Sequence, residues 1–268
     1  MKPVEEKDFH GRVQSVDRAM MLLEVLGEDE EGNRLSDLAS RTGLAPSTVH
    51  RLLTTLEQRQ FIRFDPAGRL WHIGRQAFAV GSAFARQRNI AATALPFLRR
   101  LRDQSRETVN LGIADEGEML VVSQIESREI ARAVTHVGGS VPMAASAMGK
   151  AILATYADED VTAILACHGL RRLTANTLTR RAGLVAELET VRRNGHAVDD
   201  EECQSGLRCV GATVYDHQGE ALCAISVSGL ATRITGDRIA VLGSLVAEAA
   251  GRLTLGLGGI LPGHIAAE

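Results

Sequence analysis

Hydroxyl and cationic side chains gather on one side of the segment 46–58. They are Ser47, Thr48, His50, Arg51 and Thr54, which follow Pro46 at the start of the predicted DNA-binding segment, and no carboxylate occurs among them before Glu57. Hydroxyl groups and arginine bind base edges and phosphates, and the first N–H groups of a helix bind phosphate. We therefore predict a helix that lies in the major groove of DNA, with Arg63 and Arg69 contacting phosphate beside it.

The surrounding residues predict how this helix is held. Apolar residues recur at helical spacing on its other side, at Val49, Leu52, Leu53 and Leu56. Pro46 suits the first position of a helix, and Gly43 can adopt the positive φ that ends the helix predicted over 35–42. Two helices joined by a tight turn form a helix-turn-helix, in which the second helix reads the groove.

Two short β-rich runs follow, at 61–64 and 70–73, and the turn sequence Asp65-Pro66-Ala67-Gly68 separates them. The segment 12–74 is therefore a predicted winged helix. A small helical subdomain without DNA could share this pattern, but the local charge favours DNA. Between Asn33 and Arg63 five arginines face two acids, and five minus two leaves +3 in a chain of net charge −3.

The composition limits what the rest of the chain does. With 268 residues, 45% hydrophobic and 24% charged, the chain is long enough for two soluble globular domains. The aromatic content of 3% argues against single-stranded nucleic acid held by stacking. The four cysteines form no C-x-x-C pair, and we find no secretory signal and no run of about 20 apolar residues. We expect a reduced, cytoplasmic protein that neither spans a membrane nor carries a cofactor.

The remaining segments predict an α+β order. Helices are expected at 13–26, 74–89, 91–104, 147–154, 158–166, 183–194 and 237–255. Strands are expected at 109–114, 119–125, 130–137, 196–199, 209–215 and 222–227, with a loop at 138–146. This order predicts one antiparallel sheet of about six strands, flanked by helices, with a pocket on one face.

Several separated motifs resemble the IclR family of bacterial transcriptional regulators. They are Val13–Ala19, Gly43–Leu53, Glu107–Leu111, Pro142–Ala151, Asp199–Glu202 with Gly206–Cys209, and Ala224–Gly229. The resemblance implies an N-terminal winged helix-turn-helix (12–74), a linker helix (75–90) and a C-terminal GAF-like effector-binding domain (91–258). It also implies a homodimer or homotetramer on a palindromic double-stranded operator.

The same resemblance implies an effector pocket. It places polar contacts at Asp199, Cys209, Ser226 and Ser228, backbone N–H groups at Ala147 and Met148, and apolar walls at Ile130, Ala133, Val141 and Leu207. Several donors in an apolar pocket suit a small carboxylate. Without the resemblance, the serines could be ordinary strand residues, Cys209 a buried thiol and 199–202 a solvated turn. We expect Lys150 and Arg208 to support the structure or to pair with an acid.

Two departures from the glyoxylate-type regulators alter the predicted pocket. Those proteins generally carry Gly-Ala where this chain has Ala147-Met148, and some carry Met where it has Ala133. Met148 adds side-chain bulk to the predicted pocket, and Ala133 removes it. Glyoxylate, pyruvate or a short semialdehyde or oxo acid is therefore the predicted effector of a repressor of a catabolic operon.

Other functions are kept as alternatives. The chain could be an activator of the same family. It could be an enzyme with Cys209 or Cys203 as nucleophile and His196 or His217 as base, although no recognised nucleophile spacing surrounds them. The same cysteines and histidines could bind a metal, but their loose spacing forms no familiar tetrahedral set. We therefore predict neither catalytic residues nor metal ligands.

Overall fold

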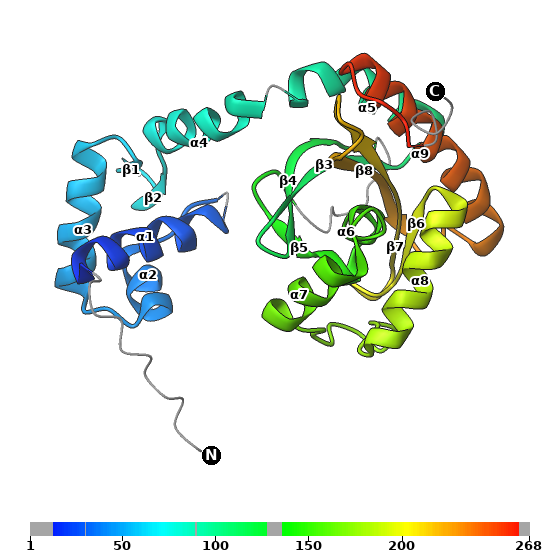
Figure 1. The fold of residues 1–268 in the computed structure, drawn as a ribbon. Coiled ribbons are helices and arrows are strands. Elements are labelled where there is room, and N and C mark those ends of the chain that lie inside the picture. Colours follow the sequence, from blue (N-terminus) through cyan, green and yellow to red (C-terminus); the bar gives the residue numbers. More distant parts are fainter. Residues whose placement is uncertain (1–12, 30, 89, 128–135, 263–268) are drawn as a thin grey trace. The chain divides into compact units, whose positions relative to one another are not determined.

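The computed structural model describes residues 13–29, 31–88, 90–127 and 136–262 (Figure 1). The chain divides into two compact units, an N-terminal unit of Met1–Gln87 and a C-terminal unit of Arg88–Glu268. The division falls inside helix α4 (Arg75–Arg88).

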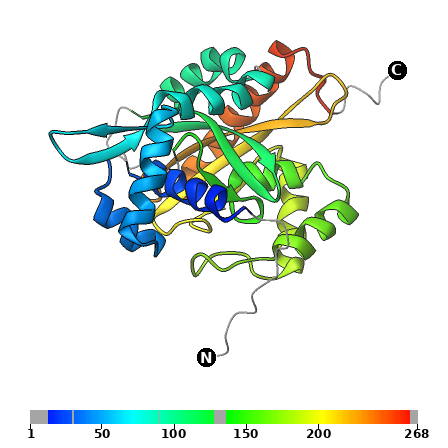
Figure 2. The ribbon, with the colours of Figure 1, turned by 90° about the vertical axis from the view of Figure 1, so that its left-hand side faces the viewer.

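The N-terminal unit is a helix-turn-helix with a wing. It consists of α1 (Gln14–Gly27), α2 (Leu35–Thr42), α3 (Pro46–Gln58), β1 (Ile62–Asp65) and β2 (Leu70–Ile73). The two strands form an antiparallel hairpin, which projects beyond the helices in Figure 2. Apolar side chains of all five elements form one core, including Leu22, Leu38, Val49, Ile62 and Trp71.

Local signals set the boundaries of this unit, and the predicted elements are confirmed. Gly43 ends α2 with φ +67°, a left-handed conformation that glycine adopts without steric cost. Pro46 occupies the first turn of α3. In the wing, the Asp65 carboxylate accepts hydrogen bonds from the N–H groups of Ala67 and Gly68, at 3.1 Å each. These bonds close the turn between the two strands.

The C-terminal unit contains one antiparallel sheet of six strands, as predicted. The strands are β3 (Thr108–Asp115), β4 (Glu118–Ile125), β5 (Ser140–Pro142), β6 (Ala197–Asp200), β7 (Leu207–Tyr215) and β8 (Ala221–Leu230). Their spatial order is β5-β4-β3-β8-β7-β6. The two central strands, β3 and β8, come from opposite ends of the unit, so the sheet joins segments more than 100 residues apart.

One segment predicted as a loop contains a strand. The loop was expected over 138–146, and the described edge strand β5 lies inside it. The strand expected over 130–137 falls mostly outside the described residues, and its two described residues, His136 and Val137, are not in a strand. Ser140–Pro142 pairs with Leu120–Glu118 of β4. A three-residue edge strand has too little alternation to be read from sequence, and its Pro142 is tolerated because only one side of the strand is paired.

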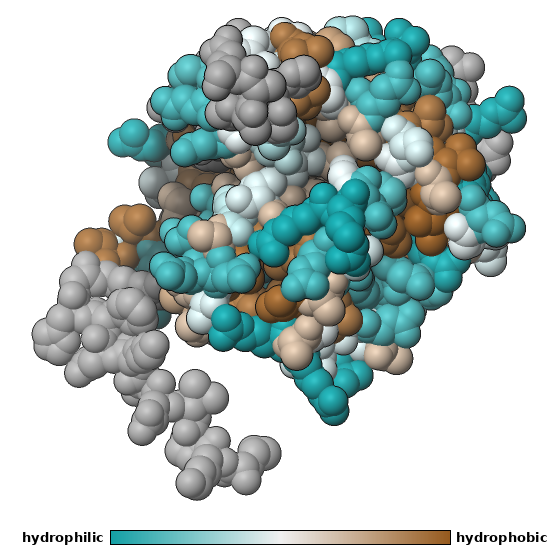
Figure 3. Space-filling model, turned by 45° about the vertical axis from the view of Figure 1, so that its right-hand side comes forward, coloured by the Kyte–Doolittle hydropathy of each residue, from teal (hydrophilic) through white to brown (hydrophobic). Residues whose placement is uncertain are grey.

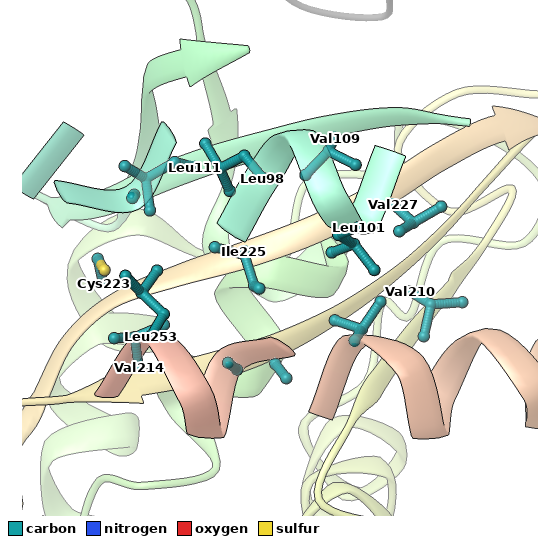
Figure 4. Close-up of a cluster of buried hydrophobic side chains, with 14 of the residues drawn as sticks. Leu98, Leu101, Val109, Leu111, Val210, Val214, Cys223, Ile225, Val227 and Leu253 are labelled. Carbon is teal, nitrogen blue, oxygen red and sulfur yellow. The ribbon is translucent and has the colours of Figure 1, made fainter. Parts of the chain in front are cut away.

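Helices cover both faces of the sheet (Figure 1). On one face lie α5 (Ile90–Ser105) and α9 (Gly236–Gly256), whose Leu98, Leu101 and Leu253 pack against Val109 and Ile225 of the strands (Figure 4). On the other face lie α6 (Ala147–Leu153), α7 (Asp158–His168) and α8 (Arg181–Asn194), which bury a second apolar cluster. A short 3₁₀ turn, Met143–Ala145, leads into α6.

Helix α9 is the one described helix whose length and composition would allow it to cross a membrane. It packs Leu242, Val246 and Leu253 into the sheet core. A helix in a protein core can have the same length and composition, so these two properties are weak evidence for a membrane span. Its outer side carries the exposed ion pair between Glu248 and Arg252. The surface in view in Figure 3 is largely hydrophilic, with hydrophobic side chains in separate patches.

Candidate functional site

Helix α3 presents the predicted DNA-binding side chains on its exposed side. Ser47, His50 and Arg51 are exposed, and Thr48 and Thr54 are half-buried. The opposite side packs Val49, Leu53 and Leu56 into the core. The Thr54 hydroxyl donates to the carbonyl oxygen of His50 at 2.9 Å, so its proton is used within the helix and its oxygen can still accept.

The structure brings part of the wing beside this helix. His50, Thr54, Glu57 and Arg69 line one groove of about 450 Å³, together with Arg34, Leu35, Ser36, Phe64 and Trp71. Phe64 and Trp71 lie ring against ring with centroids 4.7 Å apart, which stiffens the hairpin next to the groove. Arg63 is exposed on β1, outside that groove.

A second groove, of about 910 Å³, runs between α1 and the other flank of α3. Thr48, Arg51 and Thr55 lie on one wall, and Gln14, Ser15 and Arg18 on the other. Residues of α1, and Arg34 and Ser36 of the first groove, were not predicted as DNA contacts. The available signal was their charge and hydroxyl chemistry at helix starts, positions that suit phosphate contact.

Part of the positive charge between Asn33 and Arg63 is neutralised within the structure. Arg41 forms an ion pair with Glu28 and donates to the side-chain oxygen of Asn33 at 3.1 Å. Its charge is therefore largely used to fix the segment between α1 and α2. Arg51 and Arg69 remain exposed on the grooves beside α3.

In the C-terminal unit, strand register places the predicted polar residues in adjacent rows. Asp199 of β6 is opposite Cys209 of β7, which is opposite Ser228 of β8. Ser226, two residues from Ser228 and on the same face, is opposite Gly211 and Asn110. Three strands thus deliver a carboxyl, a thiol and two hydroxyls to one patch of the sheet.

The start of α6 lies directly on this patch because Gly211 has no side chain. A Cβ on Gly211 would lie 2.9 Å from the carbonyl carbon of Ala147 and 3.0 Å from the backbone nitrogen of Met148. The Ser146 hydroxyl caps the helix by accepting the N–H of Gly149 at 3.1 Å. This contact brings the backbone of Ala147 and Met148 to the two polar rows.

One buried cavity unites most of the predicted effector residues. It is lined by Val141, Ala147, Met148, Asp199, Leu207, Cys209, Ser226 and Ser228, together with Asn110, Ser146, Cys203 and Gln204, which the prediction missed. Ile130 and Ala133 lie outside the described residues. The cavity encloses about 30 Å³, which is close to the volume of one water in the liquid.

Met148 contributes to this small volume. Its sulfur and terminal methyl are so close to Gly112 of β3 that a Cβ there would lie 3.1 Å from each. The bulk expected from the sequence is therefore accommodated against the sheet. An unbranched thioether changes rotamer easily, so Met148 is the lining side chain that can give way most readily.

Asn110, which the sequence analysis did not select, orients both serines. Its amide nitrogen donates to the Ser228 oxygen at 3.1 Å and to the Ser226 oxygen at 3.5 Å. Its own oxygen accepts from the Gln124 amide at 2.8 Å, which fixes the direction of the Asn110 side chain. Because each serine oxygen accepts from Asn110, each hydroxyl can donate its proton elsewhere.

Burial strongly perturbs the acid–base chemistry of the Asp199 carboxyl. Burial raises the pKa of Asp199 to about 7, and the nearby Glu202 charge adds to the rise. The N–H groups of Glu202 and Cys203 donate to Oδ1 at 2.7 and 3.2 Å and oppose the rise. Cys209 is in hydrogen-bond contact with Asp199 and Ser228, and burial raises the pKa of its thiol well above the usual value.

A buried ion pair lies behind the cavity. The Lys150 ammonium, on α6, contacts the carboxylate of Glu202 in the turn after β6 and that of Glu187 on α8, the latter at 3.3 Å. Lys150 is fully buried. This confirms that Lys150 pairs with an acid. Arg208 likewise pairs with Asp200, and it donates to the carbonyl oxygens of Ala231 and Ile234.

The structure gives the cysteine enzyme hypothesis no support. His196 packs on Gly243 of α9, where a Cβ would lie 2.4 Å from its ring, and thus faces away from Cys209. His217 is exposed in the turn at the far end of β7. Among the described ranges of the chain, no cluster of His, Cys, Asp and Glu could hold a metal ion.

Both units match models of known protein domains. Residues 15–66 match the IclR helix-turn-helix domain, and residues 82–255 match the C-terminal domain of the bacterial transcriptional regulator IclR. The acetate operon repressor of Salmonella typhimurium is 41% identical over 253 residues, which cover 93% of this chain and 92% of that protein. The transcriptional repressor IclR of Escherichia coli is also 41% identical, over 254 residues, with the same coverage of both chains.

The fold comparison agrees with these matches. The crystal structure of the Thermotoga maritima IclR has a TM-score of 0.78 and 27% identity, over 92% of this chain and 100% of that one. The matched proteins are regulators and not enzymes. The two matched domains occur in the predicted order and take up most of the chain, which therefore belongs to the IclR family of bacterial transcriptional regulators.

Proposed function

We propose that this regulator is a repressor of a catabolic operon and that a small organic acid bound in the C-terminal cavity releases it from DNA. Repression is inferred from the names of the two relatives at 41% identity. The observation that carries the proposal is the convergence of Asp199, Cys209, Ser226 and Ser228 at one buried cavity. Activation of the same operon is the alternative.

The donors around the cavity suit a carboxylate. The Ser226 and Ser228 hydroxyls can donate to its oxygens, because Asn110 already supplies the bonds that the serine oxygens accept. The first N–H groups of a helix have no acceptor inside it, so those of Ala147 and Met148 add two donors. The free volume is close to that of one water, so binding of glyoxylate, pyruvate or a short semialdehyde acid requires a lining side chain such as Met148 to move.

We assign DNA binding to residues 12–74 and effector binding to residues 91–258. Residues 75–90 are assigned as the helix that links the two domains. We infer that α3 enters the major groove and that Arg69 of the wing contacts phosphate. A homodimer or homotetramer would place two such helices on a palindromic operator. An effector that favours a different assembly geometry would weaken binding by mismatching the half-sites. We expect the protein to act in the cytoplasm.

A thermal-shift panel of glyoxylate, pyruvate and short semialdehyde acids tests the effector assignment. A ligand that binds only the folded state stabilises it by roughly 2.7 kcal/mol at a hundredfold excess over Kd. Stabilisation by one acid, together with release of the chain from its own upstream DNA at the same concentration, is the expected result. Stabilisation by none of them would overturn the effector assignment.

Arg51→Ala is expected to weaken operator binding by about 1–3 kcal/mol, because the exposed guanidinium lies on the groove side of α3. Fluorescence anisotropy with labelled upstream DNA measures the loss at fixed salt. Arg99→Ala is the matched control, since it removes the same charge from an exposed position on α5. Equal operator binding by Arg51→Ala and wild type would contradict the placement of α3 in the major groove.

Combined Ser226→Ala and Ser228→Ala replacement is expected to abolish the response to the acid and to leave DNA binding intact. A hydrogen bond to a charged group contributes about 1.5–3 kcal/mol, and two are lost. The readout is operator release as acid is titrated in. Ser244→Ala, which removes an exposed hydroxyl from α9, is the control. An unchanged response in the double variant would place the effector elsewhere.

A further inference from the structure

We infer that Asp199 takes up one proton when a singly charged organic acid binds, and that it then donates a hydrogen bond to that acid. The inference rests on the proposed function, because it concerns the same cavity and requires an anionic ligand. It adds the protonation state of the site and the charge of the ligand that the site accepts.

The charges at the cavity carry the argument. None of the described lining residues is a cation, and the lining includes one carboxyl, that of Asp199. An acid bound there would bring a second negative charge into a small, water-poor space. Two carboxylates that share such a site cannot both stay ionised without a large penalty, so one of them holds a proton.

The charged groups packed around Asp199 do not offset the energetic cost of placing two carboxylates together. Lys150 on α6 faces Glu202 in the turn after β6 and Glu187 on α8, so one positive charge is shared by two negative charges. One minus two leaves −1 behind the cavity even with Asp199 neutral. Near Cys203, Glu118 and Arg171 carry opposite charges. The Cys203 and Cys209 thiols stay protonated, because burial raises the pKa of each.

Geometry indicates which atom holds the proton. Both backbone donors, the N–H groups of Glu202 and Cys203, go to Oδ1 of Asp199. Oδ2 receives neither of these backbone donors, so it is the oxygen that we expect to carry the proton and donate it to a ligand oxygen, beside the Cys209 thiol that contacts the same carboxyl. The Ser226 and Ser228 hydroxyls and the protonated Asp199 would then form a set of donors that includes no cation among the described lining residues, which suits a monoanion and disfavours a dianion.

The pH dependence follows from the pKa of Asp199 in the free protein, which is about 7. Below that value the group already holds its proton, and affinity does not change with pH. Above it, each pH unit reduces the affinity about tenfold, because the proton must be taken from a more basic solution. Between pH 6 and pH 8.5 the apparent Kd for the acid should rise on the order of 30-fold.

Isothermal titration calorimetry with glyoxylate and with pyruvate tests this on the full chain. Titrations at pH 8.5 in two buffers of different ionisation enthalpy should give uptake of close to one proton per acid bound. Asp199→Asn keeps an oxygen for the two backbone donors and a neutral donor for the ligand. It should bind at pH 8.5 about as tightly as wild type binds at pH 6, without proton uptake.

Two further titrations sharpen the result. Cys209→Ser removes the neighbouring thiol and should keep the pH slope, whatever its affinity. Oxalate, the dianion with the same number of carbons as glyoxylate, should bind at least about tenfold more weakly.

The outcomes separate the two proposals. Binding of glyoxylate or pyruvate with no pH dependence, or oxalate binding as tight as glyoxylate, would overturn the proton uptake and leave the effector site standing. No binding of glyoxylate or pyruvate at any pH, by wild type or by Asp199→Asn, together with no stabilisation by the semialdehyde acids of the panel, would overturn both. The pH profile is measured on the wild-type protein, so the test remains decisive even if a variant folds poorly.

Discussion

Lys150→Met is expected to destabilise the C-terminal unit by about 3–5 kcal/mol, which is the usual effect of removing one partner from a buried ion pair. Lys150 is fully buried, and Glu202 is 6% exposed. The replacement would leave the Glu202 carboxylate in the interior without its cation. Its Oε2 already lacks a hydrogen-bond partner among the described residues, so the carboxylate would keep little beyond the backbone N–H of Asp200 to stabilise its charge.

This loss should depend on pH. Burial already raises the pKa of Glu202, and Lys150 opposes the rise. Without Lys150, the folded variant would hold a proton on Glu202 that the unfolded chain releases at lower pH. The folded state then binds more protons than the unfolded state, so the variant becomes less stable as pH rises. Urea unfolding of the full chain at pH 5.5 and pH 8 should show the larger deficit at pH 8.

A double variant provides the matched control. Lys150→Met combined with Glu202→Leu replaces the pair by apolar side chains, an exchange that is often neutral or stabilising. It should recover at least about 2 kcal/mol of the loss in the single variant. A single-variant loss below about 1 kcal/mol would mean that water reaches the pair, as in surface salt bridges.

Local signals made the N-terminal unit predictable. Gly43 and Pro46 indicate a turn and the start of a helix within four residues. Asp65 and Gly68 indicate the turn of the wing. Each of these effects acts over a few residues, so sequence alone determines the element boundaries. The exposed side of α3 follows directly from them, because the apolar spacing fixes which side is buried.

The cavity depends on contacts that are distant in the chain. Asp199, Cys209 and Ser228 were selected by family resemblance, but only the register of β6, β7 and β8 places them in one row. Asn110 was missed because it comes from β3, more than 80 residues before Asp199, and an asparagine in a strand carries no ligand signal of its own. The acid pairing of Lys150 was predicted, but its complete burial was not, because Glu187 and Glu202, which it contacts, are 37 and 52 residues away in the chain.

Gly211→Ala is expected to destabilise the C-terminal unit by about 1–3 kcal/mol, the range for overpacking a well-filled core. The new methyl would lie 2.9–3.0 Å from backbone atoms of Ala147 and Met148, so the start of α6 must move. The same movement would shift the two N–H groups proposed to bind the acid. Affinity for glyoxylate should therefore fall by about tenfold or more, equivalent to roughly 1.4 kcal/mol.

The sign of the stability change makes this a sharp test. Replacing glycine by alanine usually stabilises a protein by about 0.4–1 kcal/mol where the conformation allows, because the unfolded chain loses freedom. Gly251→Ala, inside α9, is the matched control, since its Cβ would meet only Leu261 side-chain atoms at 3.8 and 3.9 Å. Urea unfolding should show the two substitutions moving stability in opposite directions. Stabilisation by both would mean that α6 can leave the sheet freely, and the cavity between them would then not be a preformed site.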